Sequence, residues 1–568
     1  MRFENYPTPT LDGRYFCPVK PQTLIPLSKM EPMDAQLFSL DAPHSDDLVA
    51  VDALADALRG IDYSNAAIEQ VLGASAADAL ADDDPEPARV ALLNRGDGPI
   101  EVLIRLWLLG EEVANEDIER ALPGCGVTGL KALNLVAESS PATVRALWDL
   151  RPYDVDGELL WISSDQGAMQ QQGRLRADHV LGVGQASLTL AHATVRTPVE
   201  SALDIGTGCG IQAIHLLSHA ATVTVTDISA RALSFARFNL ALNRKSLDLD
   251  EQLSRVTFRR GSLLEPIANE RFDLIVSNPP FVITPRTERT EASGRYEYRD
   301  GGAEGDTIVA ELIRNLPNHL NPGGIAQMLS NWEIKQGQQL WYGRLQAWVP
   351  EGVSSWVVQR DEQSGPDYAR LWLRDAAESR EAGYYRQGLK EYLEDFAARD
   401  VQSIGFGLVL LQRPTTTDPV WQRWEEYSAA LNPPLGPAIA STVARMNELG
   451  VSGDTVSFAP ETLNKVAQLR LQPATDVTYE QYRRLGATDP EIIMVRQGSG
   501  FARAQAVSSA AAGLVAAFDG SYTVAELIAG YQSLLPEEAR DSFDAQALLS
   551  ELTHLYVDGF VKATDLSV

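Results

Sequence analysis

The chain has 568 residues, which is too many for one hydrophobic core, so we expect two to four domains. Its formal net charge of −29 excludes general electrostatic attraction to phosphate backbones, so any contact with nucleic acid must be local. The three cysteines have no metal-binding spacing, and the sequence has no long apolar run and no export signal at its start; together these features predict a cytoplasmic protein without a structural metal or a membrane anchor.

The first 153 residues divide into two predicted parts. Residues 1–45 are rich in proline and polar residues without a period, which predicts an extended or disordered leader. Residues 46–153 show a helical, alanine- and leucine-rich pattern that ends in short alternating stretches. Three short helices followed by a hairpin are typical of a winged-helix-like domain. Such a domain would bind nucleic acid or shape a substrate cleft, and the lack of basic residues on the presumed recognition helix favours the second interpretation.

Residues 154–414 alternate between predicted strands and helices, which indicates an α/β fold with a doubly wound, mostly parallel sheet. Seven strands are expected, at 202–205, 222–226, 256–258, 272–277, 325–329, 356–358 and 405–411.

The first of these strands runs into a glycine-rich turn. Gly206, Gly208 and Gly210 follow Asp204 at the carboxyl end of the strand, where open α/β sheets bind ligands. Asp227 ends the next strand and could accept hydrogen bonds from both hydroxyls of a ribose. The spacing G-x-G-x-G differs from the dinucleotide pattern G-x-G-x-x-G, and an acid at 204 would repel a pyrophosphate. The turn therefore predicts an adenosine-type cofactor other than NAD.

Together with a second motif after the fourth strand, this turn resembles the class I S-adenosylmethionine-dependent methyltransferases. Residues 204–210 (DIGTGCG) and Asp227 resemble the cofactor site, and residues 278–281 (NPPF) resemble the catalytic turn of the amino-methyltransferases. The match is greatest to the small-methyltransferase-domain group, which includes release-factor glutamine and ribosomal RNA guanine-N2 methyltransferases. The multidomain organisation resembles uncharacterised actinobacterial methyltransferases. The resemblance covers roughly residues 155–414 and implies a Rossmann-like, seven-stranded catalytic domain with S-adenosylmethionine as cofactor.

The resemblance also implies which residues form the site. Ser262 stands where many relatives carry an acid that meets the adenine amine, and His179 lies in a segment that closes over the methionine end of the cofactor or faces the substrate. The alternative for His179 is a structural role. The implied cofactor contacts are Asp204, Gly206, Thr207, Gly208, Gly210, Asp227, Ile228, Ser262, Leu263 and Asn278.

The chemistry of the NPPF turn follows from its residue types. An amide or aromatic amine is a poor nucleophile because its lone pair is delocalised. Hydrogen bonds from such an NH₂ group to the Asn278 side-chain oxygen and the Pro279 carbonyl would release the lone pair toward the methyl donor. Pro279 and Pro280 fix the backbone, and Phe281 could stack on a flat acceptor. The transfer would then depend mainly on positioning.

The segment from 283 to 305 follows this turn and carries arginines and tyrosines interleaved with glutamates. Arg295 and Tyr298 are the candidate substrate contacts within it. The segment is either a lid that grips the substrate or a solvated loop whose charges pair with one another.

Residues 415–568 are expected to form an α+β domain with a winged-helix-like end. Trp421, Trp424 and Tyr427 recur at three-residue steps, which predicts a packed helix. Further helices are expected at about 506–518, 523–534 and 543–558, and the acidity of this end argues against a grip on DNA.

Three functions are compatible with these features. The preferred hypothesis is N-methylation of the exocyclic amine of a nucleic-acid base, with structured RNA favoured over DNA. The alternative is N5-methylation of a glutamine in a translation (release) factor. The third, a protein that binds a cofactor or partner without catalysis, is disfavoured by the intact NPPF turn. The sequence indicates no oligomeric state.

Overall fold

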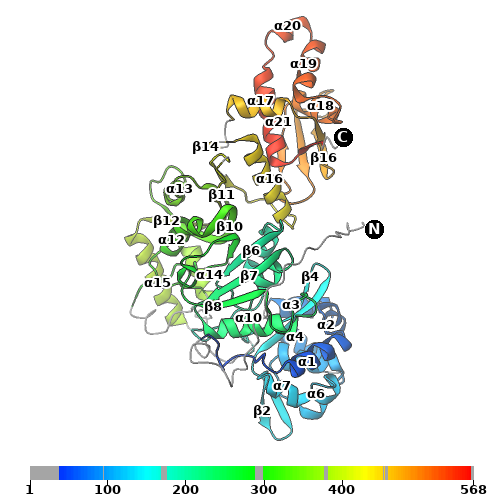
Figure 1. Cartoon of the computed structure of the whole chain (residues 1–568), viewed down its shortest axis with the longest axis vertical. Coiled ribbons are helices and arrows are strands. Elements are labelled where there is room, and N and C mark those ends of the chain that lie inside the picture. Colours follow the sequence, from blue (N-terminus) through cyan, green and yellow to red (C-terminus); the bar gives the residue numbers. More distant parts are fainter. Residues whose placement is uncertain are drawn as a thin grey trace.

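The computed structural model describes residues 37–82, 84–93, 95–167, 170, 175–287, 299–375, 382–416, 418–451, 453–454 and 458–564. Figure 1 shows three parts along the long axis of the molecule, with a helical N-terminal region at one end, a large sheet in the middle and the C-terminal region at the other end. Within the described ranges, no helix is long and apolar enough to cross a membrane.

The N-terminal region is mainly helical, as the alanine- and leucine-rich pattern predicts. Its small sheet has the order β1-β3-β2, and β4 and β5 form a separate hairpin. The winged-helix-like arrangement stays a prediction. The elements are α1 Leu48–Gly60, α2 Asn65–Leu72, α3 Ala74–Ala81, α4 Glu86–Leu92, α5 Pro99–Leu103, η3 Ile104–Leu108, β1 Val113–Ala114, α6 Asn115–Ala121, α7 Gly126–Ala132, β2 Val136–Ser140, β3 Thr143–Ala146, β4 Asp149–Val155 and β5 Glu158–Ser164.

Residues 37–45 are packed on the rest of the chain, so the leader predicted over 1–45 is wrong for this part. The Phe38 ring meets the edge of Phe258 at 5.6 Å, and the Arg237 guanidinium lies 4.9 Å from the Phe38 ring centre. The Ser39 N–H donates to the Ser234 hydroxyl at 2.9 Å. One aromatic anchor thus orders a stretch whose composition alone indicates disorder. Residues 1–36 lie outside the described residues.

The expected α/β fold is confirmed, and all seven predicted strands form, but the sheet has nine strands in the described part of the chain. Their order is β14-β13-β11-β12-β10-β9-β6-β7-β8, and β12 runs antiparallel to both of its neighbours. The strands are β6 Val199–Ile205, β7 Ala220–Asp227, β8 Val256–Arg260, β9 Phe272–Ser277, β10 Leu320–Lys335, β11 Ser354–Ser364, β12 Val401–Gln412, β13 Trp421–Glu426 and β14 Gly453–Asp454.

Strand β13 replaces the helix predicted around Trp421, Trp424 and Tyr427. It pairs in parallel with β11, where Trp424 is opposite Val357. Trp421 is fully buried and Arg423 nearly so, which is the two-residue alternation of a strand. The backbone groups at the edge of β11 need partners, and β13 supplies them. These backbone hydrogen bonds outweigh the three-residue spacing of the aromatic residues, and the segment forms a strand instead of a helix.

Helices cover both faces of the sheet. Helices α8 Gln185–Ala193, α9 Ile211–Leu216 and α10 Ala230–Leu242 share a core with Ala202 of β6, whereas α12 Thr307–Asn315 and α13 Gly343–Trp348 share one with Leu203 and Ile205. Strand β6 lies between β7 and β9, so the chain order reverses there, and ligands bind outside the carboxyl ends of strands at such a point. Short 3₁₀ turns η4 Glu265–Ile267 and η5 Leu316–His319 and helices α14 Gly365–Asp375 and α15 Ala382–Ala398 complete this part.

The C-terminal region contains the three helices predicted near its end, here α18, α19 and α21. It also has a three-stranded sheet β16-β17-β18 and a two-stranded sheet β15-β19. The elements are α16 Gly436–Leu449, α17 Pro460–Ala467, β15 Leu471–Pro473, β16 Val477–Tyr482, β17 Ile492–Gln497, β18 Ala504–Ala506, α18 Ser509–Ala517, α19 Val524–Leu534, α20 Glu537–Arg540, α21 Ala545–Asp558 and β19 Val561–Ala563.

Replacing Trp421 tests whether β13 belongs to the core of the sheet. The indole is fully buried and donates to the Asn447 side chain at 2.8 Å, so Trp421→Ala should destabilise the protein by about 3–5 kcal/mol. The measurement is the midpoint of urea denaturation. Gln422→Ala on the other face of the strand is the control, and equal small shifts for both variants would contradict the assignment.

Candidate active site

A cavity of about 550 Å³ lies at the carboxyl ends of β6, β7 and β9. The glycine turn, the start of α10 and the turn after β9 all contribute to it, together with a segment that precedes α8. The lining residues are 177–182, Ser187, 205–209, 211–212, 226–229, Ala232, 261–263, 278–280, 300–302 and Ile308.

The glycine turn presents its backbone to this cavity. Gly206 and Gly208 have positive φ angles of 73° and 55°, which L side chains rarely adopt. A Cβ atom on Gly208 would meet no atom within 4 Å, so this side of the turn is open. The Gly206 and Thr207 N–H groups donate to the Thr226 carbonyl at 2.9 and 3.0 Å, which fixes the turn against β7.

Gly210 has a different role from the one predicted for it. It is not part of the cavity lining, and a Cβ atom there would lie 3.1 Å from Ala236 of α10. The absence of a side chain at Gly210 therefore permits the close approach of α9 and α10.

Asp227 links the turn to the end of β7. One carboxylate oxygen accepts the Gly208 N–H at 3.0 Å and the other accepts the Ser229 N–H at 2.9 Å. Asp227 is also part of the cavity lining. The other residues predicted on this side of the cofactor, Thr207, Ile228, Ser262 and Leu263, line the same cavity.

Asp204 lies behind the turn instead of in the cavity wall. Its side chain is completely buried, and neither carboxylate oxygen makes a hydrogen bond of good geometry with a described residue. Burial raises the pKa of Asp204 to about 7, and the nearby charge of Asp227 acts in the same direction. Asp204 is not part of the cavity lining, and its role as a cofactor contact stays a prediction.

The turn after β9 places Asn278, Pro279 and Pro280 in the cavity lining. The Pro279 carbonyl already accepts the Phe281 N–H at 2.8 Å and retains its second lone pair. Phe281, by contrast, is not part of the lining. Its ring packs against the core, and its backbone pairs with Asp300.

Of the three candidate substrate residues, only His179 lies within the described residues. His179 lines the cavity but is buried, with its Nδ1 3.6 Å from the Asp165 carboxylate. Burial is the main cause that lowers the pKa of His179, so the ring is neutral near pH 7. Arg295 and Tyr298 lie outside the described residues.

The base of the predicted lid is held by internal contacts. The Val282 N–H donates to the Arg299 carbonyl at 2.8 Å, and Arg286 makes two hydrogen bonds to the Asp300 carboxylate at 2.8 and 3.0 Å. Residues 300–302, which these contacts hold, are part of the cavity lining.

The segment around His179 is predicted from the sequence to lie over the cofactor or to face the substrate, and residues 177–182 do line the cavity. Sequence reasoning missed Ser187 and Gln212, which also line the cavity, and the Gln212 side chain donates to the Ser187 carbonyl at 2.8 Å. It also missed the buried ion pair of Arg231 and Asp165, which contacts residues 178 and 180. The available signal was an arginine near the start of a helix in which apolar residues occupy most positions, since such a helix is buried and its charges must be paired.

Two family models match the chain. The methyltransferase small domain matches residues 182–293, which include the glycine turn, Asp227 and the turn after β9. A domain of unknown function (DUF7059) matches residues 60–147.

Curated relatives match the same part of the chain. The ribosomal protein uL3 glutamine methyltransferase of Bradyrhizobium diazoefficiens is 38% identical over 157 residues, which are 27% of this chain and 46% of the relative. The release factor glutamine methyltransferase of Geobacter sulfurreducens is 39% identical over 137 residues, 23% of this chain and 45% of the relative. The chain thus spans about half the length of these two. A putative protein N5-glutamine methyltransferase of Methanocaldococcus jannaschii is 30% identical over 146 residues, 26% of this chain and 68% of the relative.

The raised pKa of Asp204 predicts a pH dependence of stability. Between pH 4 and pH 7 the unfolded chain releases a proton that the folded chain keeps, so stability falls by about 4 kcal/mol as the pH rises through this range. Asp204→Asn has no carboxyl group to titrate at this position and so should not show this loss. The unfolding free energy of the variant minus that of the wild type should therefore be larger at pH 8 than at pH 5. Thermal unfolding at both pH values measures the difference. The exposed Asp541→Asn is the control, and a pH-independent effect of Asp204→Asn would contradict the prediction.

Proposed function

We propose that this chain, which belongs to the family of methyltransferases with the methyltransferase small domain, transfers a methyl group from S-adenosylmethionine to the side-chain amide of a glutamine in a protein. The observation that carries the proposal is the placement of Asn278 and Pro279 in the same cavity as the glycine turn and Asp227. The relatives named as glutamine methyltransferases share this part of the chain.

The residues present fit S-adenosylmethionine. The open backbone of Gly206 and Gly208 permits close approach of a ligand. The Asp227 carboxylate lies in the cavity lining at the end of β7, and we assign to it the hydrogen bonds from the ribose hydroxyls. Ile228 and Leu263 supply apolar surface for a purine. When bound there, the cofactor supplies an activated methyl group on a sulfonium sulfur.

The chain's own contribution is to orient the acceptor. The Asn278 side-chain oxygen and the free lone pair of the Pro279 carbonyl would accept hydrogen bonds from the two N–H groups of an amide. These bonds favour a pyramidal nitrogen whose lone pair can attack the methyl carbon. The nitrogen would form a bond to the methyl carbon while the carbon–sulfur bond breaks and its electron pair stays on sulfur, and the methylated nitrogen would release one proton to water. Positioning of this kind accounts for most of the catalysis of an in-line transfer.

A protein amide is favoured over a nucleic-acid base, which was the preferred acceptor from the sequence. The curated relatives described above are named for action on a release factor, ribosomal protein uL3 or an unspecified protein glutamine. The net charge of −29 also disfavours a phosphate-rich acceptor. We therefore propose a release factor or a ribosomal protein as the acceptor.

Transfer of labelled methyl groups tests the proposed acceptor. The full chain and labelled S-adenosylmethionine are incubated with purified release factors, with ribosomal proteins and with deproteinised RNA from a strain that lacks the enzyme. Label should enter protein, and mass spectrometry of peptides should place one methyl group on a glutamine. Label in RNA alone would overturn the proposal.

Asn278→Ala tests the role of the turn. The variant loses the acceptor that orients the amide, so transfer should fall by about 100-fold or more while the dissociation constant for the cofactor changes by less than about twofold. Filter assays of transfer and calorimetric titration give the two values. The exposed Asn315→Ala serves as the control. Equal loss of transfer and cofactor binding in Asn278→Ala would mean that the turn is only structural.

A further inference from the structure

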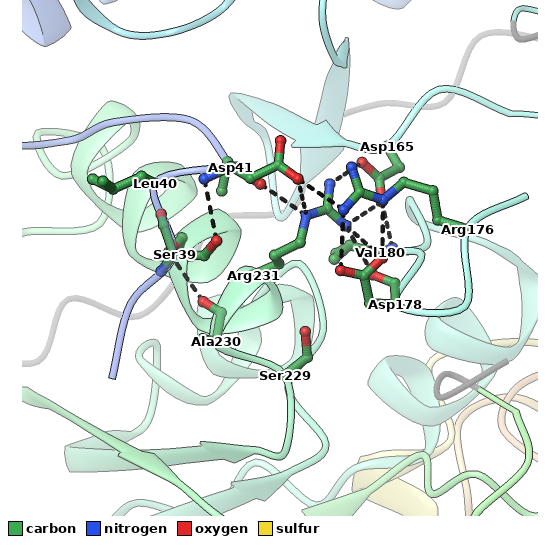
Figure 2. Close-up of polar contacts among 12 residues, drawn as sticks. Ser39, Leu40, Asp41, Asp165, Arg176, Asp178, Val180, Ser229, Ala230 and Arg231 are labelled. Atoms are coloured by element: carbon green, nitrogen blue, oxygen red, sulfur yellow. Dashed lines mark hydrogen bonds and ion pairs between the residues drawn. The ribbon is translucent and has the colours of Figure 1, made fainter. Parts of the chain in front are cut away.

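A cluster of charged residues around the buried Arg231 contacts the segment 177–182, which lines the cavity (Figure 2). Arg231, at the start of α10, directs its guanidinium toward Asp165. The two guanidinium nitrogens donate to the two carboxylate oxygens at 2.9 and 2.7 Å. Arg231 is 4% exposed and Asp165 is 3% exposed, so the pair is shielded from water. Neighbours of Arg231 on the same helix, Ser229 and Ala232, line the cavity.

We infer that Arg231 is a positioning residue for the cofactor cavity, which it shapes by holding the segment 177–182 in place together with Asp165 and Asp41. This inference rests on the proposed function only in assigning the cavity to S-adenosylmethionine. It concerns the wall of the cavity and not the acceptor.

The segment 177–182, called the wall segment below, is held at Asp178 and at Val180. Arg231 donates to the Asp178 carbonyl at 2.8 Å. The Val180 N–H donates to the Asp165 carboxylate at 2.8 Å, and the Val180 carbonyl accepts the Asp165 N–H at 3.0 Å. His179 lies between these anchors and lines the cavity. One ion pair therefore sets the position of the wall on both sides of His179.

The N-terminal segment completes the support. Arg231 Nε donates to the Asp41 carbonyl at 2.8 Å, and the Asp41 carboxylate pairs with Arg176 at 2.7 Å. Arg176 in turn makes hydrogen bonds of 2.9 and 3.2 Å to the carboxylate of Asp178. Residues 41, 176, 178 and 231 thus form a closed ring of contacts, and its members come from three separate stretches of the chain (Figure 2).

The aromatic surroundings restrict the guanidinium further. Arg231 lies 5.3 Å from the ring centre of Trp148 and 5.6 Å from that of Phe235. Removing one partner of a buried ion pair leaves an uncompensated charge, whereas the aromatic contacts alone give no support to the wall. The loss of Arg231 should therefore displace the segment 177–182.

Arg237 on the same helix provides a matched control. It is 6% exposed, pairs with Asp46 at 3.0 Å and lies over Phe38 of the N-terminal segment. Arg237 is not part of the cavity lining, and its ion pair and its aromatic contact in the described structure are both with residues of the N-terminal part of the chain and not with residues 177–182. Arg231→Met and Arg237→Met therefore each replace a buried arginine that is ion-paired and lies over an aromatic ring, although Asp46 is more exposed than Asp165. Only the first variant removes the anchor of residues 177–182.

The test is calorimetric titration of the full chain with S-adenosylhomocysteine, alongside thermal unfolding of each variant. Arg231→Met should weaken binding by about tenfold or more, and Arg237→Met by less than about twofold at a similar loss of stability. Arg231→Lys keeps the charge but cannot bond both carboxylate oxygens, so it should restore part of the affinity. Asp165→Asn, a milder change, should weaken binding to a similar extent as Arg231→Lys. The effects of the two substitutions should not add, so the double variant should bind about as well as either single variant.

Wild-type affinity in Arg231→Lys and Asp165→Asn would overturn the inference, as would equal losses of affinity in the Arg231 and Arg237 variants. If Arg231→Met does not fold, the two milder variants decide the question. No acceptor is present in this experiment. A protein that binds S-adenosylhomocysteine as expected but methylates no glutamine would contradict the proposed function and leave the role of Arg231 intact.

Discussion

Helix α10 lies inside the molecule, with every residue from Arg231 to Leu242 buried. Its polar side chains cannot rely on water, so each needs a partner in a neighbouring segment. Asn239 bonds both backbone groups of Ser163 and also donates to the Cys209 carbonyl of the glycine turn. Asn243 holds both backbone groups of Trp161 in the same way. The hairpin β4–β5 and the glycine turn are therefore placed relative to each other through one helix.

The sequence predicted the strands whose formation depends on local pattern. Strands β6 to β9 alternate with helices at short intervals, and the turns after them carry glycine, aspartate or proline that end an element. Strand β13 could not be predicted in this way. Trp421 and Trp424 have a spacing compatible with a helix, and they form a strand because β11 offers a free edge. Long-range pairing of this kind leaves no mark in the local sequence.

The same distinction between local sequence patterns and long-range contacts applies to the candidate site. Asp227 and Asn278 were predicted because each follows directly on the end of a strand, and such ends meet at one edge of the sheet. The sequence placed the segment around His179 at the cofactor or substrate, but it did not show what holds residues 177–182, because their anchors are remote in sequence. Asp165 and Arg231 are 66 positions apart, and Asp41 and Arg231 are 190 apart. A single sequence shows that a buried arginine needs an acid, but it does not show which one.

The attachment of the N-terminal region bears on its role. The sequence left open whether this region binds nucleic acid or shapes the site. Asp165 follows β5 directly, and Arg244, just after α10, pairs with Asp52 of α1 at 2.6 Å. The region shares one hydrophobic core with α9 and α10. Its packing therefore fixes the position of Asp165 and, through Asp165, the wall of the cavity. This favours the interpretation that the N-terminal region shapes the site, because a change in its packing would reach the cofactor cavity without any contact to nucleic acid.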